Sequence, residues 1–408
     1  MVENSRKDGA RSVSKMKQTE IGVIPEEWEV VKIANVVNFD NGLAHEGIEN
    51  ENGDFIVINS KFISTEGNVV RKVTKQLKPL VVNDICIVMS DIPNGKALAK
   101  CYLVEKNNTY TLNQRIGRIT PIKDYPKFFY YVLNRNKYYL SFDSGSGQTN
   151  LRKNEVLDCV IPLPPLAEQE AIATALSDAD AWIESLEQLI AKKRLIKQGA
   201  MQELLTPKDD WKVKKLGEVI ESTQLGGNYQ NSEEQNDYPL MKMGNLQRGF
   251  ISLKKIEYVK GQIPSEKDLL KTNDLLFNTR NTLDLVGKVS IWRNELPKAY
   301  FNSNIMRISF NKKFIASNVF VNAVFNTKEF LGKLKDIATG TTSVAAIYTR
   351  DLFELEFSFP SLSEQERIAT ILSDMDTELE ALEKQLGKAQ QIKQGMMQEL
   401  LTGRVRLV

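Results

Sequence analysis

Apolar residues recur with a helical period in two long stretches of the chain. In both stretches the apolar positions are separated alternately by four and three residues. A mean spacing of about 3.5 residues is typical of helices that bury one seam against a partner helix. The seam positions are Ile172, Leu176, Ala179, Ile183, Leu186 and Ile190 in the first stretch, and Ile368, Leu372, Met375, Leu379, Leu382, Leu386 and Ala389 in the second.

The phase of this pattern changes near the end of each stretch. A second consecutive step of three leads to Ile196 and Ile392, after which Leu204 and Leu400 are reached by steps of four. Such a slip overwinds a supercoil locally or turns the apolar face toward another surface. We therefore assign the docking of a partner protein to apolar residues beyond the slip, namely Ile196, Met201, Leu204, Ile392, Met397 and Leu400.

The two stretches are copies of one segment. Residues 164–206 align with residues 360–402 without a gap, and 26 of these 43 positions are identical. Weaker matches upstream pair 26–37, 81–88 and 113–120 with 209–220, 271–278 and 302–309. The order of block, repeat, block, repeat predicts a pseudo-twofold arrangement in which two helices of roughly 57 Å pack antiparallel. The alternative is that each helix packs separately on its own block.

The ends and the glycines of the predicted helices give two further expectations. Prolines followed by acidic residues mark each start, and Ser361 with Glu364 or Ser363 with Glu366 fits a capping box in the second copy. Gly199 and Gly395 lie inside the helices, where glycine is about 1 kcal/mol less favourable than alanine. We expect a close helix crossing there, with a slight kink or a tolerated surface glycine as the alternative.

The blocks between the repeats have the pattern of compact α+β domains. Short β-like runs at 54–63, 84–89, 274–279 and 286–292 are separated by turn residues, helices are expected within 125–142 and 317–334, and loops at 143–150 and 337–344. The predicted fold class is α+β, with two globular domains joined by two long antiparallel, coiled-coil-like helices. The expected division is a flexible leader (1–20), a first domain (21–162), a first repeat helix (163–206), a second domain (207–358), a second repeat helix (359–402) and a tail (403–408).

Composition argues against several classes of protein. The chain has no apolar run near the ~18 residues that a membrane span needs, and its basic start lacks the apolar core of a secretory signal. Cys86, Cys101 and Cys159 have no CxxC spacing and are odd in number. This argues against a disulfide framework and a zinc cluster, so we expect a reducing, cytoplasmic compartment.

Catalytic signatures are missing from the sequence. It contains no P-loop, no HExxH, no nucleophile elbow, no dinucleotide fingerprint and no adenine-methyltransferase motif. The single histidine, His45, lies in a loop-like segment and is expected to be an ordinary surface residue. A catalytic carboxylate pair stays open, because the chain has 52 acidic residues. We assign no catalytic, cofactor-binding or metal-binding residue.

Charge is distributed unevenly along the chain. The two blocks carry net charges of +1 and +4, whereas the two repeats carry −3 and −4. Basic blocks suit a polyanion, and Arg and Asn make bidentate contacts to guanine and adenine edges. Candidate DNA-binding residues, chosen for residue type and loop-like setting, are Asn59, Lys61, Lys96, Asn113, Arg115, Gln148 and Asn150 in the first block, and Lys242, Asn245, Arg248, Arg280, Asn281, Thr341 and Thr342 in the second.

The repeats resemble a known family. "LAEQEAIATALSDAD" and "LSEQERIATILSDMD", each followed downstream by "KQG", one variable residue and "MQELLT", are similar to the specificity subunits of type I restriction–modification systems. The resemblance covers essentially the whole chain after the leader. It implies that each block is a target recognition domain that reads one half of a split DNA sequence, while the antiparallel helices set the gap and dock methyltransferase subunits.

The same resemblance implies a subunit without catalytic activity or cofactor. Two methyltransferase subunits would bind S-adenosylmethionine, and two restriction/translocase subunits would use ATP and magnesium. A self-contained DNA-modifying enzyme and a coiled-coil scaffold without a DNA role are the competing hypotheses.

Overall fold

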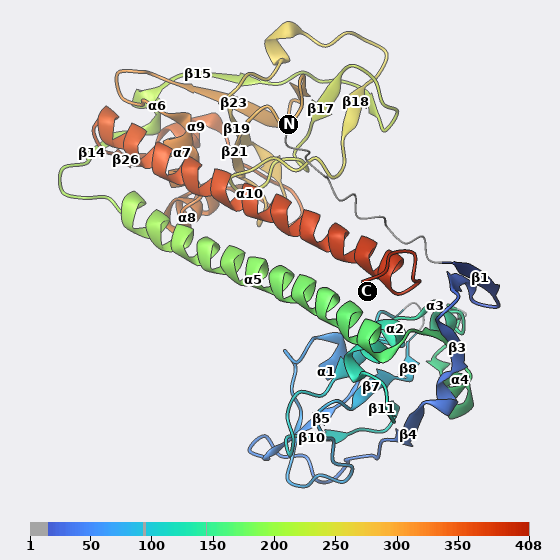
Figure 1. Ribbon diagram of the computed structural model, residues 1–408. Helices are drawn as coiled ribbons and strands as arrows, with labels where there is room; N and C mark the ends of the chain where they lie inside the picture. The colour runs from blue at the N-terminus through green and yellow to red at the C-terminus, as the bar shows by residue number, and fades with distance from the viewer. Residues whose placement is uncertain (1–14, 93–94, 144, 408) are drawn as a thin grey trace, which may run out of the picture. The chain divides into compact units, whose positions relative to one another are not determined.

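The chain folds into two units, each of which combines a mixed α/β globule with parts of both long helices (Figure 1). The computed structural model describes residues 15–92, 95–143 and 145–407. The first unit comprises Met1–Leu186 and Gln385–Val408, and the second comprises Glu187–Lys384. No helix in the described part carries an apolar stretch long enough to cross a membrane.

The first unit is built around a four-stranded antiparallel sheet in the order β4-β11-β7-β9. A second sheet, β10-β5-β6, contains the parallel pair β10 and β5. Two-stranded sheets β1-β2, β3-β13 and β8-β12 complete the globule. Its elements are β1 Met16–Thr19, β2 Gly22–Pro25, β3 Glu29–Lys32, β4 Val37–Asn41, β5 Phe55–Ile58, α1 Ser60–Ser64, β6 Lys72–Val73, β7 Ile85–Val88, β8 Ser90–Asp91, β9 Cys101–Leu103, β10 Tyr110–Leu112, β11 Ile116–Pro121, α2 Pro126–Leu133, α3 Lys137–Leu140, β12 Thr149–Asn150, α4 Lys153–Leu157 and β13 Val160–Leu163.

The second unit repeats this plan. Its central sheet runs β15-β23-β19-β21, its second sheet runs β16-β18-β17-β22 with β17 and β22 parallel, and its smaller sheets are β14-β26 and β20-β25-β24. The elements are β14 Lys212–Lys215, α6 Leu216–Val219, β15 Ile220–Leu225, β16 Asn231–Ser232, β17 Pro239–Met241, β18 Glu257–Val259, β19 Leu275–Asn278, β20 Arg280–Asn281, β21 Val289–Ile291, β22 Tyr300–Phe301, β23 Ile305–Phe310, α7 Asn318–Phe325, α8 Lys328–Asp336, β24 Thr339–Gly340, β25 Ala345–Ala346, α9 Thr349–Phe353 and β26 Glu356–Phe359.

The central strands are apolar on both faces because both faces are covered. All four residues of β7 and of β19 are buried. Helices α2 and α7 each bury several aromatic and branched residues in the same core clusters as these strands. The expected helices at 125–142 and 317–334 are present, each divided into two. The expected loops at 143–150 and 337–344 contain the short strands β12 and β24, so they are not entirely irregular.

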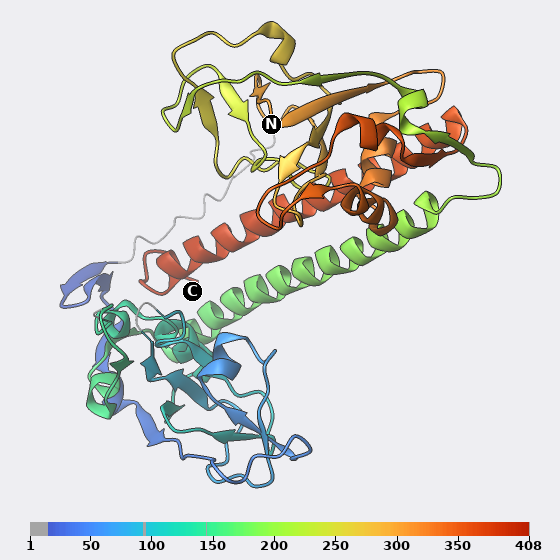
Figure 2. The same cartoon turned by 180° about the vertical axis from the view of Figure 1, so that it is seen from behind.

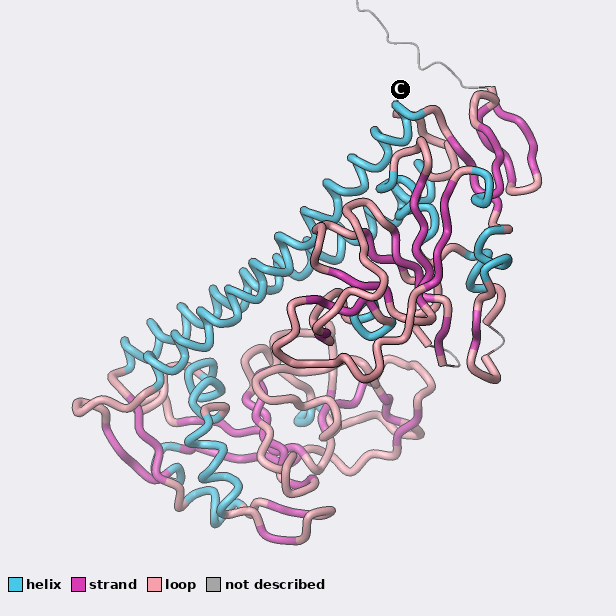
Figure 3. Tube along the Cα trace, turned by 90° about the horizontal axis from the view of Figure 1, so that it is seen from below, coloured by secondary structure: helices cyan, strands magenta, loops and turns pink. Residues whose placement is uncertain are grey.

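The two long helices are α5 (Leu166–Leu205, 40 residues) and α10 (Leu362–Leu400, 39 residues). Within each unit the segments of α5 and α10 lie side by side, as Figure 2 and Figure 3 show, and the colours of Figure 2 show that they run in opposite directions. Asp180 pairs with Lys393 in the first unit, and Asp376 pairs with Lys197 in the second. These two ion pairs are equivalent by the 196-residue offset of the repeat. The predicted α+β fold with an antiparallel helix pair is therefore confirmed within each unit.

The phase slip turns the apolar face from the seam toward the globules. Leu186 and Ile190 of the seam are buried, and Leu379, Leu382 and Leu386 are half-buried. Beyond them, Ile196 and Ile392 are 46% and 42% exposed. The following turns re-enter a core: Met201, Leu204 and Leu205 join the core of the second unit, and Met396, Met397, Leu400 and Leu401 that of the first.

A buried glutamine attaches the start of each long helix to its globule. In the first unit Gln169 Nε2 donates to Asp124 Oδ1 and Pro164 O, and its Oε1 accepts from Tyr125 N. In the second unit Gln365 Nε2 donates to Phe314 O and Pro360 O, and its Oε1 accepts from Ala316 N. At the start of α10, Ser361 Oγ accepts from Glu364 N, which settles the capping position.

The C-terminal residues are part of the first unit rather than a separate tail. Gly403 is buried with a φ of 70°, and a Cβ there would clash with Pro25. Arg406 pairs with Glu168, a carboxylate with 0% exposure that also accepts a hydrogen bond of 2.9 Å from Trp28 Nε1. The leader expectation is also wrong in part, because Met16–Thr19 forms β1 and pairs with β2; residues 1–14 lie outside the described residues.

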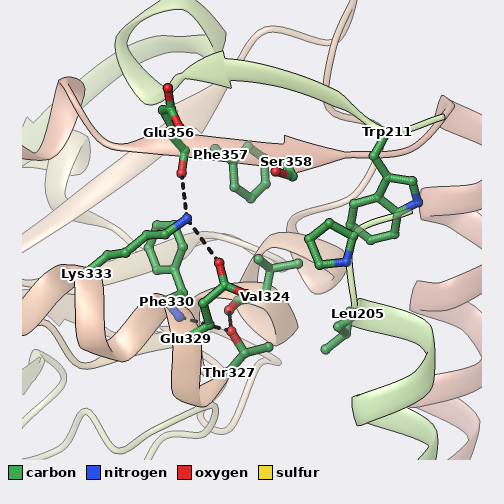
Figure 4. A pocket seen from close by; sticks show the side chains of 11 residues that line it. Leu205, Trp211, Val324, Thr327, Glu329, Phe330, Lys333, Glu356, Phe357 and Ser358 are labelled. Atoms are coloured by element: carbon green, nitrogen blue, oxygen red, sulfur yellow. Dashed lines mark hydrogen bonds and ion pairs between the residues drawn. The ribbon is translucent and has the colours of Figure 1, made fainter. Parts of the chain in front are cut away.

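In the second unit the end of α5 meets the globule at a small aromatic cluster (Figure 4). Leu205 and Trp211 share a buried core with Phe330 and Phe357. Lys333 Nζ at its rim lies 3.2 Å from Glu329 Oε1 and donates to Glu356 O at 3.4 Å. The cavity between these residues has a volume of about 20 Å³, little more than a single water requires, so it is a packing feature rather than a ligand site.

The expected close helix crossing at Gly199 and Gly395 is wrong. A Cβ added at either glycine would meet no atom within 4 Å. Gly199→Ala and Gly395→Ala should therefore each raise the free energy of unfolding by about 1 kcal/mol, because alanine favours the helix. Denaturant unfolding measures this, with Gly403→Ala as a control that should lower stability. A loss of stability at Gly199 would show that its surface is covered.

Removing the guanidinium of Arg406 leaves the buried Glu168 carboxylate without its counter-ion. Arg406→Ala should lower the free energy of unfolding by about 3–5 kcal/mol. The control is Arg404→Ala, since Arg404 has a 66% exposed side chain and should change stability by less than about 0.5 kcal/mol. Equal effects of the two substitutions in thermal and denaturant unfolding would contradict a specific role of the Arg406–Glu168 pair.

Candidate nucleic-acid interface

One polar edge of the first unit gathers all seven candidate DNA-binding residues of the first block. Four segments are joined there by backbone hydrogen bonds: Asn113 N donates to Ile58 O, Met89 N to Arg115 O, and Leu151 N to Met89 O. The pairing of β8 with β12 completes the chain of contacts. We call residues 58–61, 89–91, 96, 113–115 and 148–150 the first polar edge.

Side chains on the first polar edge form a small amide–hydroxyl network. Gln148 Nε2 donates to Ser90 Oγ at 2.8 Å, and Ser90 Oγ donates to Asn150 Oδ1 at 2.7 Å. Gln148 and Asn150 are exposed, and within the described residues Gln148 Oε1 and Asn150 Nδ2 have no protein partner. An acceptor and a donor are thus held at fixed positions and presented outward, as base-edge recognition requires.

The first polar edge also carries positively charged side chains. Lys61, Lys96 and Arg115 are exposed, and Arg115 is held in the left-handed region with a φ of 66°. Asp91 fixes the backbone directly after Lys96, because its Oδ2 accepts from Ala97 N and Leu98 N. Such cations suit phosphate contacts, which position a protein on DNA.

The second unit builds the equivalent edge with the same backbone hydrogen bonds. Asn302 N donates to Met241 O, Thr279 N to Asn304 O, and Ile347 N to Thr279 O. Strand β20 pairs with β25, as β8 pairs with β12, and Leu283 N donates to Thr342 O. Residues 241–242, 279–281, 302–304 and 341–347 form this second polar edge, where Arg280, Thr341 and Thr342 are exposed.

Several candidate DNA-binding side chains already bond to other groups of the protein. Asn245 is wrong as a base-reading residue, since it is 4% exposed and its side chain bonds to Lys242 N, Ser252 O and Lys255 O. Asn59 caps α1 by accepting from Phe62 N. Lys242 pairs with Glu257 at 2.9 Å, Asn281 bonds to Asn278 Oδ1 and Thr282 N, and Arg248 lies away from the edge, where it lines a cavity.

Sequence reasoning missed four residues of the edges: Ser90, Thr279, Asn302 and Asn304. The alignment of 113–120 with 302–309 held the signal for the last two, because it places Asn302 opposite Asn113 and Asn304 opposite Arg115. Ser90 and Thr279 follow the central strands β7 and β19, and their position on an edge depends on tertiary pairing that no local pattern encodes.

The described residues show neither an exposed cysteine thiol nor a cluster of potential metal ligands. Burial raises the pKa of the Cys86 and Cys101 thiols, and that of Cys159 to about 11. The described part holds no group of three or more His, Cys, Asp and Glu side chains placed to bind a metal ion. His45 is 2% exposed, so the expectation of a surface residue is wrong; its Nε2 lies 2.9 Å from Thr111 Oγ1.

The residues assigned to partner docking differ in exposure. Ile196 and Ile392 lie on the surface together with Leu195, which is 69% exposed. Leu400, by contrast, is 4% exposed, and Met201, Leu204 and Met397 pack against the globule cores. Ile196 and Ile392 are therefore the most exposed members of the set, whereas Met201, Leu204 and Met397 are half-buried.

Comparison with known proteins decides the family. The family model described as "Type I restriction modification DNA specificity domain" matches residues 25–193 and again 208–394. The chain belongs to this family. The resemblance noted from the repeats is thereby confirmed, and the double match follows the internal repeat of this specificity-family chain.

Relatives match over nearly their whole length. The type I restriction enzyme MjaVIII specificity subunit of Methanocaldococcus jannaschii is 24% identical, with 94% of each chain covered. The EcoKI specificity subunit of Escherichia coli is 20% identical over 90% of this chain and 86% of the relative. The crystal structure of the type I restriction-modification system S subunit from M. genitalium has the same fold, with a TM-score of 0.61, 16% identity and coverage of 95% of this chain and 98% of that one.

The two polar edges of this specificity-family chain should act on different DNA positions. Gln148→Ala should weaken discrimination in one half-site and Arg280→Ala in the other, each by about 1–3 kcal/mol per contacted base pair. Binding to a library of DNA duplexes at fixed salt measures both preferences separately. Lys312→Ala removes an exposed cation outside the edges and should leave both preferences unchanged. A change in both half-sites from one substitution would contradict the assignment.

Proposed function

We propose that this chain is the non-catalytic subunit that reads a bipartite, asymmetric DNA sequence and assembles methyltransferase and restriction subunits on it. The observation that carries the proposal is the doubled polar edge. One backbone arrangement occurs in both units, yet its exposed side chains differ, with Gln148 and Asn150 on one and Arg280 and Thr341 on the other. Two edges that share a frame and differ in chemistry suit two different half-sites.

The helix pair supports the assembly part of the proposal. Its two segments are acidic and identical at 26 of 43 positions, and each leaves an isoleucine exposed at an equivalent position, Ile196 or Ile392. Equivalent surfaces suit two copies of one partner, here two methyltransferase subunits, followed by two restriction/translocase subunits. A solved structure titled as concerning complex assembly in the type I R-M system has a similar fold, with a TM-score of 0.51 at 15% identity.

Methylation and ATP-dependent cleavage would be carried out by the partner subunits. S-adenosylmethionine, ATP and magnesium would be bound by the methyltransferase and translocase subunits in the cytoplasm, and no cofactor by this chain. The family match favours this reading over a self-contained modifying enzyme and over a scaffold without a DNA role.

Exchange of one unit's globule tests the proposal directly. Replacing residues 21–162 by the corresponding block of another family member should change one half of the recognised sequence and leave the other half intact. Methylation of a random-sequence DNA library by the complex with its methyltransferase reads out both halves, and the isolated chain should transfer no methyl group. An unchanged target after the exchange would support a scaffold, and methyl transfer by the isolated chain would support an enzyme.

A further inference from the structure

The second unit contains a cavity of about 300 Å³ beside α7, lined by both apolar and charged side chains. Its walls come from α5, α7 and α10 and from two loops of the globule that carry Arg248–Phe250 and Arg293. All of the lining residues belong to this one unit. The volume lies at the lower end of the range of small-molecule sites, roughly 300–1,000 Å³.

The equivalent place in the first unit is filled by the chain itself. Helix α2 occupies the position of α7, with Lys127 and Tyr131 where α7 has Val319 and Ala323. Tyr131 Oη donates to Asp180 Oδ2 at 2.7 Å, and Lys127 Nζ donates to Ser177 Oγ at 3.0 Å. Lys393, the ion-pair partner of Asp180, lies 5.8 Å from the centroid of the Tyr131 ring. The Tyr131 phenol thus contacts both members of this Asp–Lys pair, while the Lys127 ammonium bonds to Ser177.

In the second unit the aromatic ring that packs on the equivalent Asp–Lys pair of the first unit is missing. Asp376 and Lys197 both line the cavity, and the short side chains of Val319 and Ala323 stand where the first unit has the long ones. Arg293 Nη2 approaches Asp376 Oδ2 at 3.4 Å from the opposite wall. The cavity therefore includes the space that an aromatic ring occupies in the first unit.

The cavity also has an excess of positive charge. Three cations line it, Lys197, Arg248 and Arg293. Among the described residues that line the cavity, Asp376 is the single carboxylate. Lys288 lies close to Arg248, is 7% exposed and bonds to Gln247 Oε1. Desolvation lowers the pKa of both Arg248 and Lys288, and the neighbouring Arg248 lowers that of Lys288 further. Within the described residues neither has a carboxylate partner within 4.0 Å, so an incoming anion would be stabilised here.

We propose that this cavity binds a small organic anion that carries an aromatic ring. The ring would take the space that Tyr131 fills in the first unit, with Phe250 on the outer wall, and the anionic group would pair with Arg248 and Arg293. A nucleoside monophosphate and a simple aromatic carboxylate share this chemistry. The site is separate from both polar edges, because neither edge includes a residue that lines the cavity.

Calorimetric titration of the full chain tests the proposal with four probes: adenosine monophosphate, 4-hydroxyphenylacetate, adenosine and inorganic phosphate. We expect saturable 1:1 binding of a ring-bearing anion at least about 10-fold tighter than that of neutral adenosine or phosphate alone. Binding of the nucleotide alone would identify the ligand as a nucleotide, and binding of the carboxylate alone as an aromatic acid. No saturable binding of either, or equal binding of inorganic phosphate, would overturn the proposal.

Substitutions locate the binding. Val319→Lys combined with Ala323→Tyr installs the residues of the first unit and should abolish binding while the chain still unfolds cooperatively. Arg293→Ala should weaken binding by about 10- to 100-fold, because a charge-assisted contact is lost. Lys312→Ala makes the same change of charge at an exposed site outside the cavity and should leave the affinity unchanged. Binding that survives both cavity variants lies elsewhere and contradicts the proposal.

Discussion

The rest of the structure depends on the burial of both ends of two helices of about forty residues. A single helix cannot cover its own apolar stripe, so each stretch of the stripe needs a partner surface. The start of α10 and the end of α5 share the core of the second unit through Ile368, Leu372 and Leu205, and the start of α5 and the end of α10 share that of the first through Ile172, Leu176 and Leu400. Each globule thus depends on two helix ends that are far apart in sequence. The equivalent end segments 196–206 and 392–402 differ at one position, while the globules have diverged.

The weaker matches between the globules mark the residues that fix the sheet turns. Asn83 and Asn273 both adopt positive φ values, 75° and 67°, directly before an aspartate. Asp84 Oδ2 accepts from Val81 N and Asp274 Oδ2 from Lys271 N, which closes each turn. Arg118 and Arg307 reach the same aspartates at 3.7 Å and 2.9 Å. With this frame held, the segments that follow can change their exposed side chains without loss of the fold.

Periodic patterns predicted the helices and strands, which depend on local sequence. They did not predict which side chains are buried or hydrogen-bonded, because that depends on residues far away in the sequence. The stripe predicted the helices within three residues of their observed ends, and the β-like runs at 84–89 and 274–279 became β7 and β19. The burial of His45 depends on Thr111, 66 residues away, and Asn245 is occupied by two carbonyl groups that its loop brings back to it. Gly199 looked like a crossing point because helix propensity alone says nothing of the space around a residue. Composition thus suggested the type of interface residue, but tertiary pairing determined which residues remained free.

The two polar edges also differ in the kind of contact that they offer. On the first edge Ser90 holds the amides of Gln148 and Asn150 in one orientation, so that an acceptor and a donor point outward together. An amide that offers both groups matches adenine, whereas a guanidinium such as that of Arg280 matches the two acceptors of guanine. The second edge has Arg280 beside threonine hydroxyls and no equivalent amide pair among its exposed described residues. If each edge reads one half-site, the asymmetry of the target follows from this chemical difference, because an amide pair and a guanidinium select different bases.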